Sequence, residues 1–429
     1  MRLFYSSRCN LRSLHSLVLL LGLFHYANAQ APAARIATYP TLGNPTAALA
    51  TPDSQYIFVT VTNVGGPNYS TPDSEAGKRH GVVSGLQIFR NTGGKLQSVG
   101  LVRLGSKGAN GITLLPDGKT FVVGVGDAGV AFVDIQDAIH GTAKPYFAPQ
   151  GKSAGTYDVV STPDGKYLFS ANEYGHFQGQ RGNVGILTVH YDAAGRVTHA
   201  QTIGHIPAGN KVPSLTISPD GTRLYVAREI FPPKGVSHFF GQSNPMLTKK
   251  DCVQRIGTPP RPNGLITVVD VKRAIAAGSG QSAIISEVAA GCSPVRVIET
   301  KDASTLFVSA RGDNRILTFS PHLLDSDPEH AFLRGFSSGG VAPVGIRLFS
   351  DESRLLVANS NRFVDSNGGV AVLDVSRPEQ PGIVETIPAG EFPRNVNLSP
   401  DGRSLYLTDY TSRTLEVIAV SPSPNRVGR

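Results

Sequence analysis

A motif built around Pro-Asp-Gly recurs along the chain and constrains its fold more than any other feature. Clear copies are TPDGKYLF from Thr162, SPDGTRLY from Ser218 and SPDGRSLY from Ser399. In such a turn, proline presets one dihedral angle, aspartate bonds its own backbone and glycine supplies positive φ. The β-branched and aromatic run that follows is typical of a strand. The seven copies have turn aspartates at Asp53, Asp117, Asp164, Asp220, Asp302, Asp351 and Asp401.

The spacing of these copies indicates the architecture. They lie 64, 47, 56, 82, 49 and 50 residues apart, so the period is close to 50 residues. Such a unit has room for four antiparallel strands, which cannot bury both of their faces alone, whereas seven units stacked radially can. The sequence therefore predicts an all-β fold, a seven-bladed β-propeller of four-stranded antiparallel blades.

The last repeat is one strand short. After its third strand, TLEVIAV, the chain ends in SPSPNRVGR, and the only unassigned strand-like segment is ARIATYP at 34–40. We expect this N-terminal strand to close the ring as the missing outer strand of blade seven, because closure removes an exposed sheet edge.

The N-terminus has the pattern of a secretory signal. Arg2, Arg8 and Arg12 precede the apolar run at 17–24, and a small-residue cleavage site ends at Ala29. The sequence thus predicts a signal peptide at 1–29, the propeller at 30–420 and a flexible tail at 421–429. No later segment has the roughly 18 uncharged apolar residues that a membrane helix requires. The protein is therefore expected to be secreted or periplasmic, and it is expected to be monomeric.

Charge and cysteine content narrow the possible partners. The formal charge of +8 falls to +5 without the leader, and no Lys/Arg-rich run or nucleic-acid-binding motif is present, so nucleic acid is disfavoured. Of three cysteines, Cys252 and Cys292 remain after the leader, and an oxidising compartment favours a disulfide over two free thiols. No cofactor and no metal ligand is predicted, although a divalent metal stays open.

Strand order predicts which loops share a face. If the Pro-Asp-Gly turns join the first two strands of each blade at one rim, the second-to-third-strand loops lie at the opposite rim. The longer insertions, at 63–85, 174–183, 230–263 and 360–368, fall in those loops. Long loops on one face of a rigid scaffold are a common place for binding. We call this predicted face the mouth.

Two groups of residues are expected at the mouth. Glu173 and His176 are candidates for proton transfer, with Tyr157 assisting. Arginines among carboxylates would suit a small acidic ligand, because a guanidinium holds a carboxylate bidentately. The alternative is that these charges solvate a wet channel or pair with one another. The candidate ligand-binding residues are Asn110, Asp158, Arg228, Glu229, Arg296, Arg311, Asn359, Arg394, Asn395 and Asp409.

Two families resemble this sequence. GCSPVRVIETKDASTLFVSARGDNRILTF and GEFPRNVNLSPDGRSLYLTDYTSRTLEVI are similar to the YVTN-type β-propeller repeat of exported proteins. YDVVSTPDGKYLFSANEY also resembles the lactonase-like seven-bladed propellers, the family of 6-phosphogluconolactonase and carboxymuconate cyclase. That resemblance implies a histidine six residues before a turn proline, plus Arg and Glu in the channel. None of the seven equivalent positions is histidine here, so Glu173 and the channel arginines alone carry over.

Two functions are compatible with these features. The first is an exported lactonase-like hydrolase or lyase that acts on a small cyclic or acidic sugar-type molecule. The second is a non-catalytic exported propeller that binds a carbohydrate, peptide or protein partner through its long loops. Loss of activity in Glu173→Gln would favour the first function, and saturable binding that survives this substitution would favour the second.

Overall fold

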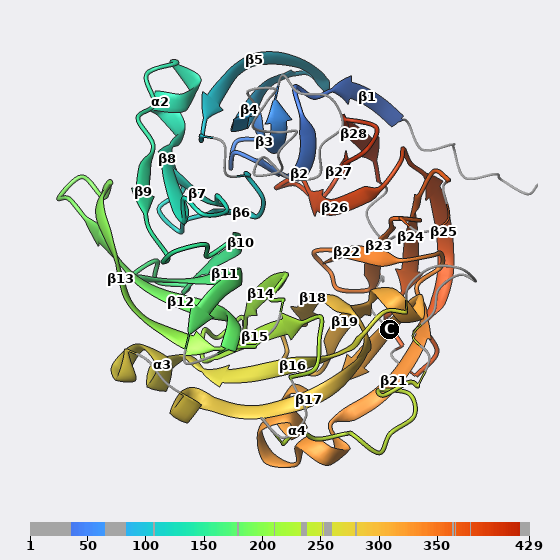
Figure 1. The fold of residues 1–429 in the computed structure, drawn as a ribbon. Helices are drawn as coiled ribbons and strands as arrows, with labels where there is room; N and C mark the ends of the chain where they lie inside the picture. Colours follow the sequence, from blue (N-terminus) through green and yellow to red (C-terminus); the bar gives the residue numbers. More distant parts are fainter. Residues whose placement is uncertain are drawn as a thin grey trace, which may run out of the picture. The chain divides into compact units, whose positions relative to one another are not determined.

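The computed structural model describes residues 36–64, 83–105, 108–177, 180–209, 211–232, 238–250, 252, 260–278, 281–362, 364, 366–377 and 379–420. The signal peptide predicted at 1–29 and the tail predicted at 421–429 lie outside these residues. Within residues 34–429, which form one compact unit, seven four-stranded antiparallel sheets are arranged around an axis (Figure 1). The predicted fold class is confirmed.

The first six blades are each built from consecutive strands, innermost strand first. Blades one to three are β2 (Asn44–Ala50), β3 (Tyr56–Val64), β4 (Val83–Thr92) and β5 (Lys95–Arg103); β6 (Ile112–Leu114), β7 (Thr120–Gly124), β8 (Val130–Asp134) and β9 (Tyr146–Ala148); and β10 (Thr156–Ser161), β11 (Tyr167–Phe177), β12 (Gln180–Tyr191) and β13 (Val197–Pro207). Blades four to six are β14 (Ser214–Ile217), β15 (Arg223–Arg228), β16 (Asn263–Asp270) and β17 (Ile284–Cys292); β18 (Pro294–Glu299), β19 (Leu306–Ala310), β20 (Arg315–Phe319) and β21 (Phe332–Ser337); and β22 (Pro343–Leu348), β23 (Arg354–Asn359), β24 (Gly369–Asp374) and β25 (Gly382–Pro388).

Blade seven joins the two ends of the propeller. Its own strands are β26 (Pro393–Leu398), β27 (Ser404–Asp409) and β28 (Thr414–Ala419), and β1 (Ile36–Pro40) is its outermost strand. β1 runs antiparallel to β28, with Ile36 opposite Ile418 and Pro40 opposite Thr414. The ring is therefore closed by the N-terminal strand, as predicted.

The repeated turns have the expected chemistry. In blade seven, the Ser399 hydroxyl donates to Asp401 Oδ1 at 2.5 Å, and the same oxygen accepts the Arg403 amide at 3.1 Å. The hydroxyl and amide hydrogen bonds lower the pKa of Asp401. Gly402 has a φ of +69°, which its missing side chain permits. The repeat thus encodes a tight bend between the first two strands of each blade.

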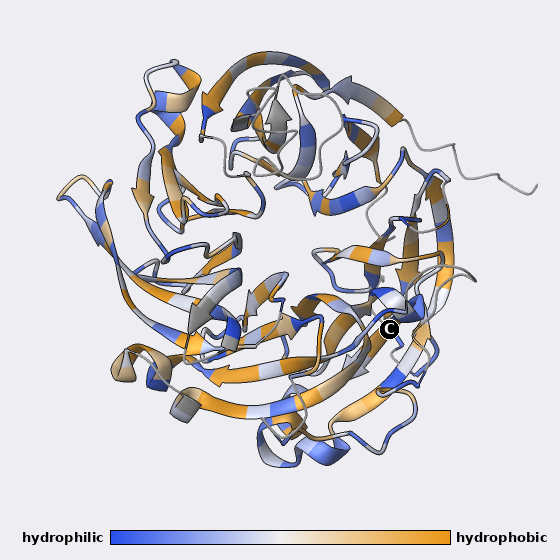
Figure 2. Ribbon diagram, in the orientation of Figure 1, coloured by the Kyte–Doolittle hydropathy of each residue, from blue (hydrophilic) through white to orange (hydrophobic). Residues whose placement is uncertain are grey.

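The core lies between blades. Seven apolar clusters among the described residues each join one pair of neighbouring blades, including the pair of blades seven and one. Between blades one and two, for example, the rings of Phe58 and Phe121 lie 4.7 Å apart. Middle strands such as β7 and β19 are buried at every position, so both faces of their sheets supply apolar side chains, and Figure 2 shows apolar segments in the strands all around the ring. Burial of these faces against neighbours on both sides is what holds the wheel together.

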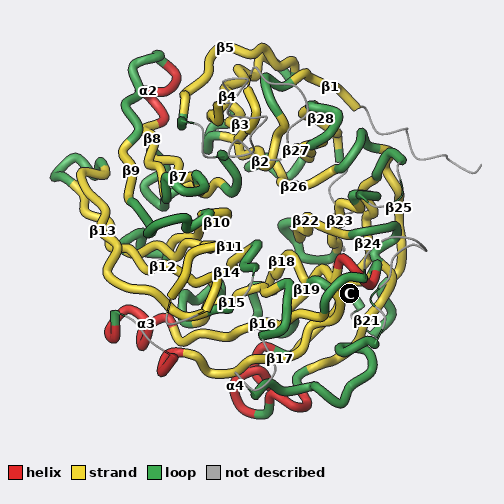
Figure 3. The backbone as a smooth tube through the Cα atoms, viewed as in Figure 1, coloured by secondary structure: helices red, strands yellow, loops and turns green. Residues whose placement is uncertain are grey.

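Among the residues that the structure describes, three short α-helices follow third strands and lie on the outer side of the wheel (Figure 3). They are α2 (Ile135–Ile139), α3 (Val271–Ala277) and α4 (Pro321–Ser326). Asp134 and Asp270 cap the first two, because their carboxylates accept the Asp137 and Arg273 amides. These aspartates are architectural.

Candidate functional site

An ion pair joins two residues that directly follow second strands, at the end of the blades where the mouth is predicted. Arg311, directly after β19, places Nη2 3.1 Å from Glu229 Oε1, directly after β15. The same nitrogen donates to Ser293 Oγ at 2.9 Å. Both charged residues are buried, at 7% and 8% exposed. Buried charges of this kind require a partner, so the pair links blades four and five rigidly.

Glu173 in β11 of blade three lies close enough to this pair to be affected by it. Burial and the charge of Glu229 raise the pKa of Glu173, against the opposing influence of Lys211 and Arg311. A hydrogen bond joins Glu173 to Tyr174, and burial together with the Glu173 charge raises the pKa of Tyr174. A carboxyl group with a raised pKa is suited to giving and taking a proton near neutral pH.

Two further arginines come from the insertions of blades four and six. Burial, followed by the charges of Arg311 and Arg362, lowers the pKa of Arg261 to about 10. Burial and the Arg311 charge likewise lower the pKa of Arg362, whose guanidinium lies 5.3 Å from the centre of the Phe392 ring. Three guanidinium groups that repel one another would be stabilised by an anion. We refer to Glu173, Glu229, Arg261, Arg311 and Arg362 as the mouth cluster.

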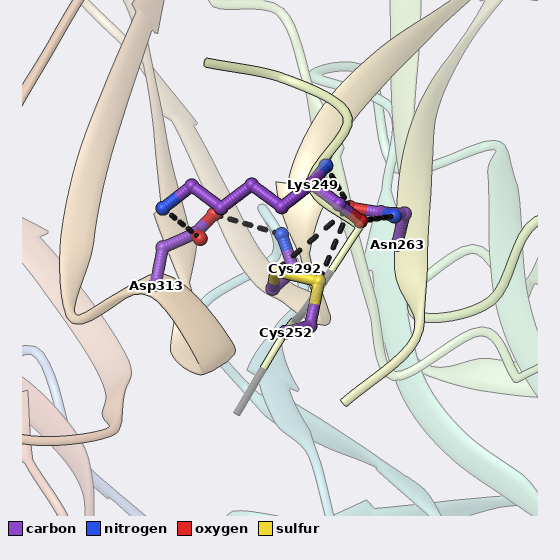
Figure 4. Close-up of a disulfide and its surroundings, with 5 residues drawn as sticks. All are labelled: Lys249, Cys252, Asn263, Cys292 and Asp313. Carbon is purple, nitrogen blue, oxygen red and sulfur yellow. Dashed lines mark hydrogen bonds and ion pairs between the residues drawn. A yellow bond between two sulfur atoms is a disulfide. The ribbon is translucent and has the colours of Figure 1, made fainter. Parts of the chain in front are cut away.

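The disulfide predicted between Cys252 and Cys292 is present (Figure 4). It also helps to position Arg261 of the mouth cluster. The Arg261 amide donates to the Cys252 carbonyl. On the other side, the Cys292 amide donates to Asp313 Oδ2 at 2.8 Å, and Asp313 Oδ1 lies 2.7 Å from Lys249 Nζ. The insertion of blade four is therefore fixed to the loop that carries Arg311.

That insertion also departs from the predicted course. Part of it leaves the mouth and runs along the outer strand of blade four, where Phe240 forms a parallel bridge with Val288. Phe239 and Leu247 pack into the apolar cluster between blades four and five. Burial of these apolar side chains explains the path, because they gain contacts there that the open mouth does not offer.

Arg394 occupies a different place from the mouth cluster. Its guanidinium lies 4.8 Å from the ring centre of Tyr410 and 5.3 Å from that of Tyr157. Burial lowers the pKa of Arg394, and Tyr410 opposes this effect. The two aromatic rings stabilise the cation by its attraction to their faces. Tyr157 thus contacts Arg394, and its assistance to Glu173 stays a prediction.

Two more predicted residues hold blades together around the channel. Arg296 Nη1 donates to the Pro213 carbonyl at 2.7 Å. Asp158 accepts amides of Val159 at 3.0 Å and Leu215 at 3.3 Å. Burial raises the pKa of Asp158, and Arg296 acts in the opposite direction. These contacts join blades three, four and five.

Arg228 and Asp409 are enclosed within the protein. Arg228 is 2% exposed and pairs with Glu287 of the same blade, so we leave it out of the proposed site. Asp409 is fully buried beside Glu416, and burial followed by the Glu416 charge raises the pKa of Asp409 to about 8. Such a pair is stable when the two carboxyl groups share a proton.

The remaining predicted residues have backbone or amide contacts. Asn359 is buried and donates from Nδ2 to the Ser338 carbonyl at 2.9 Å. Asn395 Oδ1 accepts from Asn397 Nδ2 at 3.0 Å, and the Asn110 carbonyl accepts from the Thr60 hydroxyl at 2.7 Å. The side chain of His176 lies outside the described residues. All of these residues remain predicted ligand or catalytic groups.

Sequence reasoning missed Arg261, Arg362 and Tyr410. The first two lie in insertions that were assigned to the mouth, so the available signal was an arginine within an insertion. Among the described residues, no group of three or more His, Cys, Asp or Glu is arranged to hold a metal ion. No helix in the described ranges is long and apolar enough to cross a membrane.

Comparison with known proteins supports the same family as the fold. A family model described as "Lactonase, 7-bladed beta-propeller" matches residues 333–429, which include blade six and the three C-terminal strands of blade seven. The chain is a lactonase-like seven-bladed β-propeller. No curated protein matches the sequence.

Two solved structures share the fold of this lactonase-like propeller. One, titled "Kuenenia stuttgartiensis Hydrazine Synthase", is 16% identical, with a TM-score of 0.57 over 89% of this chain and 96% of that chain. The other, titled "Crystal Structure of Mitotic Checkpoint Complex", is 12% identical, with a TM-score of 0.60 over 96% of this chain and 100% of that chain. At such identities the likeness concerns the fold alone.

Proposed function

We propose that this propeller is an exported lactonase-like hydrolase that opens a small lactone bearing an acidic group at the mouth cluster. The observation that carries the proposal is the convergence of Arg261, Arg311 and Arg362 on two glutamates, one of which has a raised pKa. Arg311 is already paired with Glu229. We assign Arg261 and Arg362, which come from the insertions of blades four and six, to the acidic group of the substrate, because a guanidinium can hold a carboxylate bidentately.

In this proposal, Glu173 transfers the protons. As a carboxylate it takes a proton from water, whose oxygen forms a bond to the lactone carbonyl carbon. The bond between that carbon and the ring oxygen then breaks, and protonated Glu173 returns the proton to the departing oxygen. The products are one neutral hydroxy acid and an unchanged enzyme, so atoms and charge balance, and the new acid then releases its proton to water.

Steady-state kinetics on a lactone with a free carboxylate, and on its methyl ester, test the role of each group. Glu173→Gln should lower kcat by about 100- to 10,000-fold, the usual contribution of a general acid or base. Arg362→Met should raise KM about tenfold for the acid and little for the ester, because only the acid needs the cation. Glu385→Gln and Arg103→Met, at exposed positions on outer strands, are the matched controls.

The same variants separate an enzyme from a binding protein. An unchanged kcat in Glu173→Gln would contradict the proton-transfer role. Saturable binding of the ring-opened acid by a wild-type protein that hydrolyses no lactone would instead favour the non-catalytic propeller.

Export is part of the proposal and has its own test. The leader pattern at 1–29 and the disulfide are its support, since disulfides persist mainly in oxidising compartments. Mass spectrometry of the mature protein from the periplasm or medium should find Gln30 at its N-terminus. An intact leader on cytoplasmic protein would contradict export.

A further inference from the structure

A cavity lies at the end of the propeller opposite the predicted mouth, among the Pro-Asp-Gly turns. Its volume is about 560 Å³, which is in the usual range for small-molecule sites. It is formed where first strands end and turns begin in blades one, two, five, six and seven, with Pro52, Lys301 and Pro400 among its residues. No residue of the mouth cluster lines it. We call it the turn-end cavity.

Most of the wall of the turn-end cavity is apolar. Apolar residues at the strand ends of several blades line the cavity, so no single blade forms it. These residues are Leu49, Leu114, Ile298, Leu348, Phe349 and Leu398. Such a wall favours a ligand with an apolar body.

The one arginine that lines this wall, Arg347 of β22, has no partner among the described residues, in either a hydrogen bond or an ion pair. It borders the cavity and is reached by solvent, yet the surrounding protein lowers its pKa by desolvation alone. A guanidinium at the border of an apolar cavity is placed to meet the acidic group of a ligand whose apolar body lies inside the cavity.

The other charged groups of the cavity already have contacts. Lys301 donates from Nζ to the Ser350 carbonyl at 2.8 Å, and its amide donates to the Glu352 carboxylate at 3.0 Å. Glu299 accepts the Tyr225 hydroxyl at 3.2 Å through Oε1. Arg347 is therefore the cation that can take an acidic group without first breaking another interaction.

We propose that the turn-end cavity binds a small organic anion, with its carboxylate or sulfonate on the Arg347 guanidinium and its apolar body against the strand ends. A guanidinium presents paired N–H donors to such an acidic group, and a partly desolvated site strengthens the attraction. The site is separate from the proposed lactone site and does not depend on it.

The probe for this test is 8-anilinonaphthalene-1-sulfonate, whose fluorescence rises in apolar sites and which carries the required anion. The chain has no tryptophan, so protein fluorescence interferes little. We expect saturable binding to the wild type, affinity at least tenfold lower in Arg347→Met, and an intermediate loss in Arg347→Lys. Arg362→Met and Arg103→Met should bind the probe as the wild type does.

Competition in the wild-type protein gives a second measurement that needs no variant to fold. Benzoate should displace the probe at concentrations at which the neutral isostere benzamide does not. Unchanged affinity in Arg347→Met, equal displacement by benzamide, or no saturable binding would each overturn the proposal. Arg347→Met should hydrolyse any lactone substrate at the wild-type rate, so failure here is distinguishable from failure of the proposed enzyme function.

Discussion

The two ends of the channel use charge in different ways. At the mouth, the most buried charges are already paired, as in Arg311 with Glu229, and further arginines gather around that pair. At the turn end, Arg347 borders an apolar cavity without a partner among the described residues. The comparison teaches that an arginine near the axis can either hold blades together or be available to a ligand, and that its partners decide which.

The largest expected effect comes from removing one partner of the mouth pair. Arg311→Met should lower the free energy of unfolding by about 3–5 kcal/mol, because Glu229 would remain buried without its cation. Arg347→Met should leave the melting temperature unchanged or raise it, since it removes an unpaired charge. Urea unfolding of both variants measures the difference. Equal losses at the two ends would abolish the comparison, and Arg311→Met/Glu229→Gln should recover part of the loss.

Removal of the disulfide should lower the stability of the protein and weaken binding at the mouth, but not binding at the turn-end cavity. Cys252→Ala/Cys292→Ala should lower the free energy of unfolding by about 2–4 kcal/mol, because the unfolded chain regains the entropy of a 40-residue loop. Ligand binding at the mouth should also weaken, since Arg261 bonds to the Cys252 carbonyl. Probe binding at the turn-end cavity is the internal control. Its parallel loss would indicate general unfolding.

The pH dependence of stability should reveal the buried acid pair in blade seven. The pKa of Asp409 is raised from 3.8 to about 8, so the folded protein holds a proton that the unfolded chain releases. This contribution is complete below about pH 4 and is lost as the pH rises towards 8. Urea unfolding between pH 4 and 9 should show the decline, and Asp409→Asn should reduce its slope. A slope identical to that of the wild type would contradict the shared proton.

Glu299, at the turn end, should also make stability depend on pH, over a narrower pH range than Asp409 does. Burial comes first among the causes that raise its pKa from 4.5 to about 7. Its stabilising contribution should therefore be lost between about pH 4.5 and 7, and Glu299→Gln should flatten the profile within that range only. A profile that changes above pH 8 in this variant would assign the effect to another group.

The smallest effect is expected in a turn that lacks the repeat's glycine. Ala303 has a φ of +53°, which is unfavourable for a residue with a side chain. Ala303→Gly should raise the free energy of unfolding by about 1 kcal/mol. A lower melting temperature would show that flexibility gained by the unfolded chain outweighs the relief of strain.

The fold was predictable because its information is local and repeated. Each Pro-Asp-Gly turn with its alternating run indicates a hairpin, and the missing strand of blade seven left one candidate, now β1. Ala303 and Glu352 stand where other repeats have glycine, and both have positive φ. The turn conformation is therefore kept even in repeats whose sequence departs from Pro-Asp-Gly.

The candidate site was predictable only in part. Strand order placed Glu173, Glu229 and Arg311 on one face, and the electrostatic influence among them agrees with this placement. Arg228 occupies the position in blade four that Arg311 nearly occupies in blade five, yet it lies inside its blade with Glu287. Sequence position cannot distinguish Arg228 from Arg311, because the place of each guanidinium depends on a carboxylate that is far away in the sequence.

The closure of blade seven also has a consequence for biosynthesis. β1 is the first strand to leave the ribosome, and β26, β27 and β28, with which it forms a sheet, are the last. Until they arrive, β1 has no sheet partner and the wheel stays open with unpaired edges. The ring can therefore close only after β26, β27 and β28 have been synthesised, and the interval before closure is when the propeller is most exposed to aggregation or to capture by chaperones.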